Sequence, residues 1–198
     1  GVFLNPADPV WRYRVSPAVN AVVFNLRTIP CAVMYPVALS AISFVASANC
    51  GVYCGANIDF VDIEISTLNI SITDLEKKLY LAKLKKKLPK VIVVVHLAGN
   101  PCDMQKIYNL KKKYGFKIIE DASHAIGAKY LDKTVGSCLY SDIVVFSFHP
   151  VKIVTSVEGG MAVTNNPRLA NTMQQLRSHG ISRDPSEMIG PTDGPWYY

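Results

Sequence analysis

The sequence predicts an α/β fold with a mostly parallel central sheet flanked by helices. From residue 58 onward, short apolar runs of strand length alternate with longer segments of helical apolar spacing, an order typical of sheets with right-handed crossovers. Residues 91–95 are all Val or Ile, which is typical of a strand buried on both faces. At 198 residues and 49% hydrophobic residues, the chain can bury one substantial core, and we expect one domain rather than two.

The first legible strand and helix lie between residues 58 and 89. Residues 58–63 alternate apolar and acidic side chains, which predicts a half-buried strand. A helix is expected next, because Thr73 and Glu76 have the spacing of a capping box and Pro89 forbids continuation. Its apolar stripe is formed by Leu75, Leu79, Leu84 and Leu88.

A second helix and two further strands follow the run at 91–95. Asp103 is placed to cap this helix and Gly115 to terminate it. The inward-facing residues are expected to be Met104, Ile107, Tyr108 and Leu110. Residues 116–119 and 142–146 are apolar runs that predict strands, and residues 130–136 between them indicate a small hairpin.

The last predicted elements are a strand and a helix. Gly159 and Gly160 lead into an expected strand at 161–164. Leu169, Met173 and Leu176 then have the spacing of an amphipathic helix that ends near residues 178–180.

The N-terminal third gives no clear pattern. No charged residue occurs between Thr28 and Ile58, a length that can span a bilayer. Several Pro, Gly and Asn residues interrupt this stretch, so we favour a segment that does not cross a membrane. Residues 1–23 lack the basic start and apolar run of a signal peptide. We therefore expect a cytoplasmic protein with no membrane partner.

Charge and cysteine usage exclude several classes of function. The net charge of +6 comes largely from lysine runs at 85–87 and 111–113, which we interpret as solvated helix faces because no aromatic residues or known motif accompany them. We expect no nucleic-acid partner. The five cysteines are odd in number and irregularly spaced, which suits reduced thiols. Cys50 and Cys54 form a lone C-x-x-x-C pair with no completing ligands, so we expect no metal site.

Three residues at predicted strand ends form the candidate site. Asp121 follows one apolar run, while Ser147 and Lys152 follow another; in open α/β sheets such positions face the ligand crevice. A partly desolvated lysine can form a Schiff base with an aldehyde, and pyridoxal 5′-phosphate (PLP) is the obvious one. A carboxylate keeps its ring nitrogen protonated, hydroxyl groups bind its phosphate, and His124 lies close to Asp121 in sequence.

Each of these residues has an ordinary structural interpretation. Asp121 could cap a helix, Ser147 could be a loop hydroxyl, and Lys152 could lie on the surface. His124 could be a polar residue with satisfied hydrogen bonds. Their combination favours a PLP site.

The motifs around these residues resemble a known family. The segments are EDASHA at 120–125, FSFHPVK at 146–152 and EGG at 158–160, with SFVASAN at 43–49, YCGA at 53–56, FVDI at 60–63, VHL at 95–97, RSHGI at 177–181 and DGPWYY at 193–198. They resemble the DegT/DnrJ/EryC1/StrS sugar aminotransferases, a branch of the fold-type I PLP enzymes, and within it the members of pseudaminic acid biosynthesis. The resemblance runs from about residue 41 to the C-terminus.

The resemblance implies a role for each candidate residue. Lys152 would carry PLP and move a proton between the cofactor and the sugar. Asp121 would pair with the pyridinium nitrogen, and His124 would contact the ring oxygen. Ser147 would hold the phosphate, and Phe44 would stack on the ring. The implied reaction moves an amino group from glutamate to C4 of a UDP-linked 4-keto-6-deoxy-N-acetyl hexose, in a homodimer.

Three features depart from the family pattern. Residues 23–30 lack the small, hydroxyl-rich turn that binds the PLP phosphate in the family. Val157 stands where the family has glycine, so we expect backbone strain there. The sequence ends at Tyr198, before the family's small C-terminal domain.

These departures leave two interpretations of the chain open. We expect an atypical segment at 1–40 and an incomplete PLP-binding large domain at 41–198. Such a chain is either an aminotransferase or a truncated or damaged member that keeps only the scaffold. Lys152 argues against the family's dehydratases, which carry histidine at that position. The absence of G-x-G-x-x-G argues against a Rossmann dehydrogenase.

Overall fold

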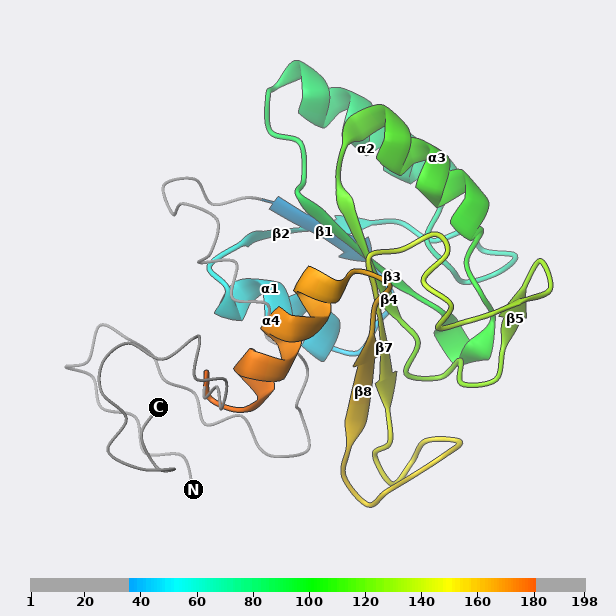
Figure 1. Cartoon of the computed structure of the whole chain (residues 1–198). Helices are drawn as coiled ribbons and strands as arrows, with labels where there is room; N and C mark the ends of the chain where they lie inside the picture. Colours follow the sequence, from blue (N-terminus) through cyan, green and yellow to red (C-terminus); the bar gives the residue numbers. More distant parts are fainter. Residues whose placement is uncertain (1–35, 181–198) are drawn as a thin grey trace, which may run out of the picture.

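The central sheet has six strands in the order β2-β1-β3-β4-β7-β8 (Figure 1). The computed structural model describes residues 36–180. All neighbouring strands are parallel except β7 and β8, which are antiparallel. The strands are β1 (Pro36–Ser40), β2 (Asn57–Val61), β3 (Val91–Val95), β4 (Lys117–Asp121), β7 (Ile143–Ser147) and β8 (Gly160–Val163). This confirms the predicted mostly parallel sheet.

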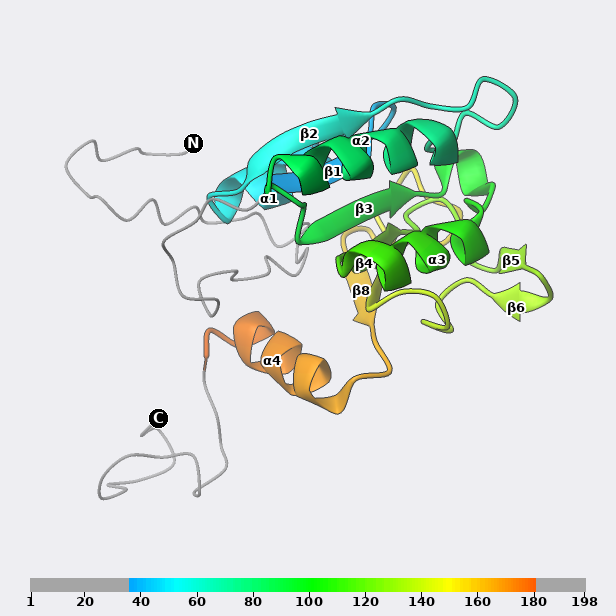
Figure 2. The same cartoon turned by 90° about the horizontal axis from the view of Figure 1, so that it is seen from above.

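Within the described residues, four α-helices flank the sheet, and a short hairpin projects from it (Figure 2). They are α1 (Ala46–Tyr53), α2 (Ile72–Leu84), α3 (Met104–Tyr114) and α4 (Pro167–Arg177); a short helical turn, η3, spans Leu97–Gly99, and β5 (Lys129–Tyr130) pairs with β6 (Lys133–Thr134). α2 and α3 pack on one face of the sheet, whereas α1 packs on the other. α4 follows β8 and lies away from α2 and α3 (Figures 1 and 2).

The central strands owe their place to their apolar character. β3 lies between β1 and β4, and Ile92–Val95 are buried, as the β-branched run predicts. β1 and α1 were not predicted, because they fall in the uncharged stretch at 28–58. The sheet therefore begins at Pro36, before residue 41.

The two helices between the strands begin at polar caps. The prediction for α3 is confirmed: the Asp103 carboxylate accepts a hydrogen bond from the Lys106 amide, and Gly115 ends the helix at φ 80°. The predicted capping box of α2 is wrong. Ser71 is the cap, because its hydroxyl accepts from the Asp74 amide at 3.2 Å.

The predicted apolar stripe of α2 is partly wrong as well. Leu75 and Leu79 are 0% and 1% exposed, as expected. Leu84 is 64% exposed, because the helix ends at this residue and its last turn extends past the sheet. Leu88 packs against the core from the loop that follows.

Apolar packing is concentrated under α2 and α3. The buried cluster there consists of Ala38, Val61, Ile70, Leu75, Leu79, Ile92, Val94, Cys102, Met104, Ile107, Leu110, Tyr114, Phe116 and Ile118. The cluster on the α1 face has only Val37, Leu39 and Val93 as fully buried members. α1 lies close to the sheet there, since a Cβ on Gly51 would meet Ile58 Cδ1 at 2.6 Å.

Several expectations concern residues beyond this range. The phosphate turn sought at 23–30, Cys31 and the motif at 193–198 lie outside the described residues. Cys50, Cys102 and Cys138 are free thiols. In the described range, 36–180, no group of acidic, His or Cys side chains is arranged to hold a metal ion. No helix between residues 36 and 180 has the length and apolar character needed to cross a bilayer.

Candidate active site

The sheet register places Asp121 and Ser147 on the same face. β4 and β7 are parallel, with Asp121 opposite Val145. Side chains alternate along a strand, so Ser147 projects on the same side as Val145 and Asp121. This is the α1 face, and both residues end their strands. Asp121 and Ser147 therefore lie at the carboxyl edge of the sheet, at the ends of neighbouring strands.

Asp121 accepts three hydrogen bonds from neighbouring groups. The Ser123 amide and hydroxyl donate to Oδ1 at 3.1 and 2.6 Å. The Ser47 hydroxyl donates to Oδ2 at 2.7 Å. Asp121 is thus held as an acceptor at the strand end rather than acting as a helix cap.

The turn before α1 brings an aromatic ring to the same edge. Phe44 is 73% exposed, and its carbonyl accepts from the Ser47 amide at 3.0 Å. The Ser43 hydroxyl donates to the Ser47 hydroxyl at 2.7 Å. Phe44 is therefore linked to Asp121 through its two serine neighbours, with its ring available to a ligand.

Lys152 lies on the loop that joins β7 to β8. Its amide donates to the His149 carbonyl at 2.9 Å, which closes a turn. The loop is pinned at its base, since the Phe148 amide donates to the Gly159 carbonyl at 2.9 Å. Lys152 is half-buried, and within residues 36–180 no hydrogen bond or ion pair joins its side chain to another residue.

Val157 distorts the loop that carries Lys152, residues 148–159, which we call the lysine loop. Its φ is 67°, in the left-handed region that costs an L-residue about 1–2 kcal/mol. A β-branched side chain is especially ill suited to it. The strain expected from the departure at this position is therefore present in the backbone.

His124 is placed by a close backbone approach. It lies in the turn after β4 and is half-buried. Gly99 has φ 83°, and a Cβ there would meet the His124 carbonyl oxygen at 2.8 Å. Only glycine allows the η3 turn to approach His124 this closely. His124 therefore lies in the turn that directly follows Asp121, the last residue of β4.

The neighbouring Glu120 belongs to the other face of the sheet. Its Oε2 lies 2.8 Å from Nε2 of His96, and both side chains are buried. His96 Nδ1 accepts from the Cys102 amide at 3.1 Å, so Nε2 carries the proton and donates to Glu120. His96 also donates its amide to the Asp121 carbonyl at 3.1 Å. This pair fixes the ends of β3 and β4 without entering the candidate site.

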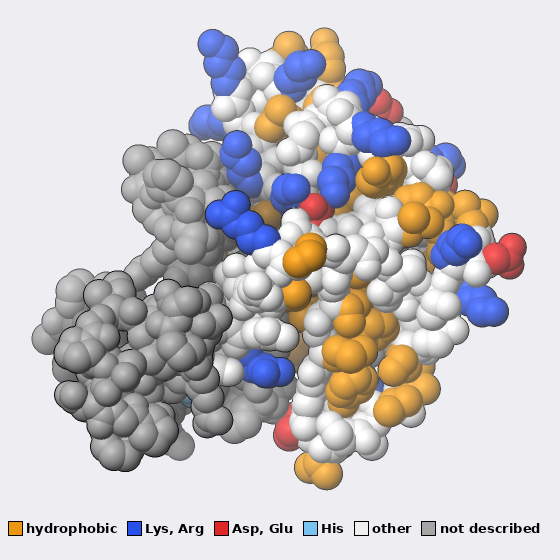
Figure 3. All heavy atoms as spheres, in the orientation of Figure 1, with side chains coloured by type: hydrophobic (Ala, Val, Ile, Leu, Met, Phe, Trp, Pro, Cys, Tyr) orange, Lys and Arg blue, Asp and Glu red, His pale blue; other side chains and the backbone are white. Residues whose placement is uncertain are grey.

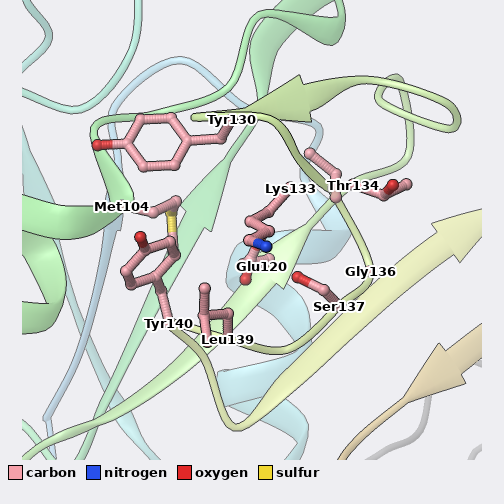
Figure 4. Close-up of a pocket in the computed structure, with 10 residues that line it drawn as sticks. Met104, Glu120, Tyr130, Lys133, Thr134, Gly136, Ser137, Leu139 and Tyr140 are labelled. Carbon is pink, nitrogen blue, oxygen red and sulfur yellow. The ribbon is translucent and has the colours of Figure 1, made fainter.

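A small hollow also lies on that other face (Figure 4). Glu120, Tyr130 and Tyr140 line it, together with Met104, Lys133, Thr134, Val135, Gly136, Ser137 and Leu139. Tyr130 and Tyr140 meet edge to face at 5.7 Å between ring centroids. None of the five predicted site residues lines this hollow.

Charged and apolar side chains gather on different parts of the surface (Figure 3). Lysines gather over α2 and α3, whereas apolar side chains are exposed around β8 and the loop before it. In that loop Val151, Ile153 and Val157 are 80%, 72% and 74% exposed. The lysine-rich faces are solvated, as expected, and several lysines pair with acids: Lys113 Nζ lies 2.7 Å from Glu76 Oε1.

Sequence reasoning did not identify two residues that contact the predicted set. Ser47 and Ser123 both hydrogen-bond Asp121. Ser123 lies two residues beyond an aspartate in a turn, a local pattern that indicates such a bond. Ser47 is 74 residues from Asp121, and its contact follows only from the fold.

Comparisons with known proteins agree with this arrangement. The sequence profile of the DegT/DnrJ/EryC1/StrS aminotransferase family matches residues 15–191. A UDP-4-amino-4,6-dideoxy-N-acetyl-beta-L-altrosamine transaminase of Campylobacter jejuni serotype O:23/36 is 45% identical over 142 residues, which are 71% of this chain and 36% of that protein. GDP-perosamine synthase of Escherichia coli O157:H7 is 38% identical over 141 residues, with the same shares of 71% and 36%.

A solved structure has the same fold. Helicobacter pylori PseC, an aminotransferase involved in the biosynthesis of pseudoaminic acid, matches with a TM-score of 0.74 and 30% identity. The match covers 92% of this chain and 48% of PseC. The chain thus spans about a third of the length of the two curated relatives, 36% in each case.

Proposed function

The chain belongs to the DegT/DnrJ/EryC1/StrS aminotransferase family, and on that premise we propose that it is the PLP-binding part of a sugar-nucleotide aminotransferase. The proposed reaction moves an amino group from glutamate to C4 of a UDP-linked 4-keto-6-deoxy-N-acetyl hexose in pseudaminic acid biosynthesis. The observation that carries the proposal is the carboxyl edge of the sheet. Asp121, with three donors, and Ser147 share one face there, and Lys152 follows on the next loop.

The residues present fit PLP, which is the cofactor of this family. Asp121 is already an acceptor held by three hydrogen bonds, as a partner for a protonated ring nitrogen requires. Ser147 supplies a hydroxyl for the phosphate, and the exposed ring of Phe44 supplies an apolar surface for the pyridine ring. Lys152 supplies the free amine.

The chain's own residues then perform the following tasks. When bound, PLP supplies an electron sink that stabilises negative charge on the substrate carbon. Lys152 Nζ would hold the cofactor in the resting protein and would move the proton at C4 of the sugar. Asp121 keeps the ring nitrogen protonated, and His124 donates to the ring oxygen. Ser147 and Phe44 orient the ring, so that each proton transfer occurs in one geometry.

The substrate class is supported by the relatives. The Campylobacter protein and PseC both carry names from the same sugar pathway, whereas the Escherichia coli protein is named for a GDP sugar. The higher identity to the first, 45% against 38%, favours the UDP-linked substrate. Competition binding with UDP and GDP sugars tests this choice.

We also propose that the protein acts in the cytoplasm as a homodimer. The exposed apolar side chains of the lysine loop and of the turn at Phe44 support a self-association surface. Sedimentation of the protein with and without PLP tests it. A monomer under both conditions would remove the dimer from the proposal.

One observation favours a second candidate, a scaffold with little or no catalysis. Val157 is strained within the loop that carries Lys152, and in this second candidate the strained loop would bind PLP weakly. The next experiment separates the two candidates.

Incubation of the purified protein with PLP tests the proposed function. A visible absorption band that survives dialysis and is lost in Lys152→Ala is expected. Lys129→Ala, an exposed lysine on β5, is the matched control and should keep the band. Adding glutamate should then convert the band to that of the pyridoxamine form. A colourless wild-type protein would contradict the proposal, and a band unaffected by glutamate would favour the non-catalytic scaffold.

A further inference from the structure

Ser47 occupies a buried position between the aromatic turn and the carboxylate. It lies in the first turn of α1 and is 6% exposed. Its hydroxyl donates to Asp121 Oδ2 at 2.7 Å and accepts from the Ser43 hydroxyl at 2.7 Å. The three side chains form a continuous chain of hydrogen bonds from the surface of the α1 turn to β4.

The chemistry of the groups fixes the direction of this chain. An ionised carboxylate only accepts hydrogen bonds, so the single proton of Ser47 is directed to Asp121. Ser43 then fills an acceptor site on Ser47. Ser43 has an alternative acceptor in the Phe44 carbonyl, at 3.2 Å, but the bond to Ser47 is shorter.

The position of α1 keeps this contact in place. Gly51 on α1 is buried, and a Cβ there would meet Ile58 Cδ1 at 2.6 Å. The helix therefore lies directly on the sheet at Gly51, and Ser47 is buried on the same helix. Loss of its hydroxyl would leave Asp121 Oδ2 without this donor in a partly buried place, where hydrogen bonds to charged groups are strongest.

We propose that Ser47 is a positioning residue for PLP, which rests on the proposed function. Its hydroxyl holds the Asp121 carboxylate in one orientation as an acceptor. The same hydroxyl ties the Phe44 turn to that carboxylate, so that the ring surface and the nitrogen partner are set in one register. Ser123 holds the other oxygen from within the same turn, whereas Ser47 is the link between β4 and the element that carries Phe44.

Three substitutions at this position separate the hydroxyl from the volume of the side chain. Ser47→Ala removes the hydroxyl, Ser47→Thr keeps it, and Ser47→Val has the shape of threonine without it. PLP affinity should fall about tenfold in the Ala and Val variants and stay within about threefold of wild type in the Thr variant. In the Ala and Val variants, the ring nitrogen of bound PLP should lose its proton at a lower pH than in wild type. The visible absorption band reports this change. Thr172→Ala, which removes a hydroxyl from α4, is the control and should change neither readout.

A second readout does not depend on the cofactor. In the protein without PLP, Ser47→Ala should speed amide hydrogen exchange at Ser123 and in the turn at 43–47, with rescue by Ser47→Thr. Wild type that retains PLP, with Ala and Val variants equal to Thr, would overturn the role of Ser47 and leave the proposed function intact. Wild type that fails to retain PLP would overturn the proposed function. In that case the amide hydrogen exchange of the protein without PLP still tests the contact of Ser47 with Asp121. Unchanged exchange in Ser47→Ala would overturn this contact, and faster exchange would support it.

Discussion

The two faces of the sheet are built differently. Fourteen buried residues form the cluster between the sheet and the α2–α3 layer, whereas the cluster under α1 has three buried members among the described residues. The α1 face instead holds Asp121 with its serines, and near it the lysine loop exposes Val151, Ile153 and Val157. The α2–α3 face holds the larger described apolar cluster, and the α1 face carries the residues of the proposed PLP site.

The difference also separates two adjacent acidic residues. Glu120 faces the packed side and pairs with His96 in the interior, where it holds strand ends together. Asp121 faces the α1 side and keeps hydroxyl donors around a partly exposed carboxylate. Alternation along one strand therefore places one acid in the packed interior and the next at the proposed PLP site.

Two isoleucines, one on each part of the molecule, test this difference with the largest expected effect. Ile107 is 0% exposed in the α2–α3 cluster, and Ile153 is 72% exposed on the lysine loop. Ile107→Ala should lower the free energy of unfolding by about 2–5 kcal/mol because it leaves a cavity. Ile153→Ala should stay within about 0.5 kcal/mol. Urea denaturation measures both, and similar losses for the two variants would contradict the assignment of stability to the α2–α3 face.

Asp142 tests the electrostatic part of the packed side. Its carboxylate lies 2.6 Å from Lys111 Nζ and 2.9 Å from the Ile118 amide, and Lys117 Nζ lies at 3.1 Å. Burial raises the pKa of Asp142, but these hydrogen bonds outweigh it and hold the pKa below its usual value. Because the pKa of Asp142 is lower in the folded than in the unfolded protein, its ionised carboxylate stabilises the fold above the unfolded pKa of about 3.9. This stabilisation is lost as the pH falls through the pKa of the folded state.

Asp142→Asn should therefore destabilise the protein by on the order of 2 kcal/mol at neutral pH. The gap from wild type should shrink as pH falls below about 3.9. Asp59→Asn is the control, since Asp59 is 57% exposed in its pair with Lys78, and should cost within about 0.5 kcal/mol. A gap for Asp142→Asn that does not change with pH would show that its ion pairs contribute nothing.

The smallest expected effect lies on the lysine loop. Val157→Gly should raise the free energy of unfolding by about 1 kcal/mol, because relief of the left-handed backbone exceeds the entropy cost of glycine. It should also strengthen PLP binding. Val154→Gly lies in the same loop without a positive φ and should be destabilising instead. If both variants lose stability, Val157 is not strained.

Much of the fold could be predicted because the α2–α3 side has strong periodicity. The β-branched run of β3, the Asp103 cap and Gly115 all act locally, and each confirmed its prediction. α1 could not be predicted, since its buried residues are Ser47 and Gly51 and no apolar stripe marks it. Its place depends on the close approach that Gly51 allows.

The candidate site was predictable to a similar degree. Asp121, Ser147 and Lys152 follow strands, and strand ends in a parallel sheet meet at one edge. The cap of α2 was misassigned because Ser71 and Thr73 are both suitable caps, and only the backbone at Ser71 is extended. The bond from Ser47 to Asp121 could not be predicted, because 74 residues separate the two.

The proposed PLP site lies on the α1 face, at the carboxyl edge of the sheet, and is built around Lys152. The most direct measurement is borohydride reduction of the PLP-loaded protein, followed by digestion and mass spectrometry of the labelled peptide. One phosphopyridoxyl group, on Lys152, is expected. Label spread over the exposed lysines of α2 and α3 with none on Lys152 would contradict it.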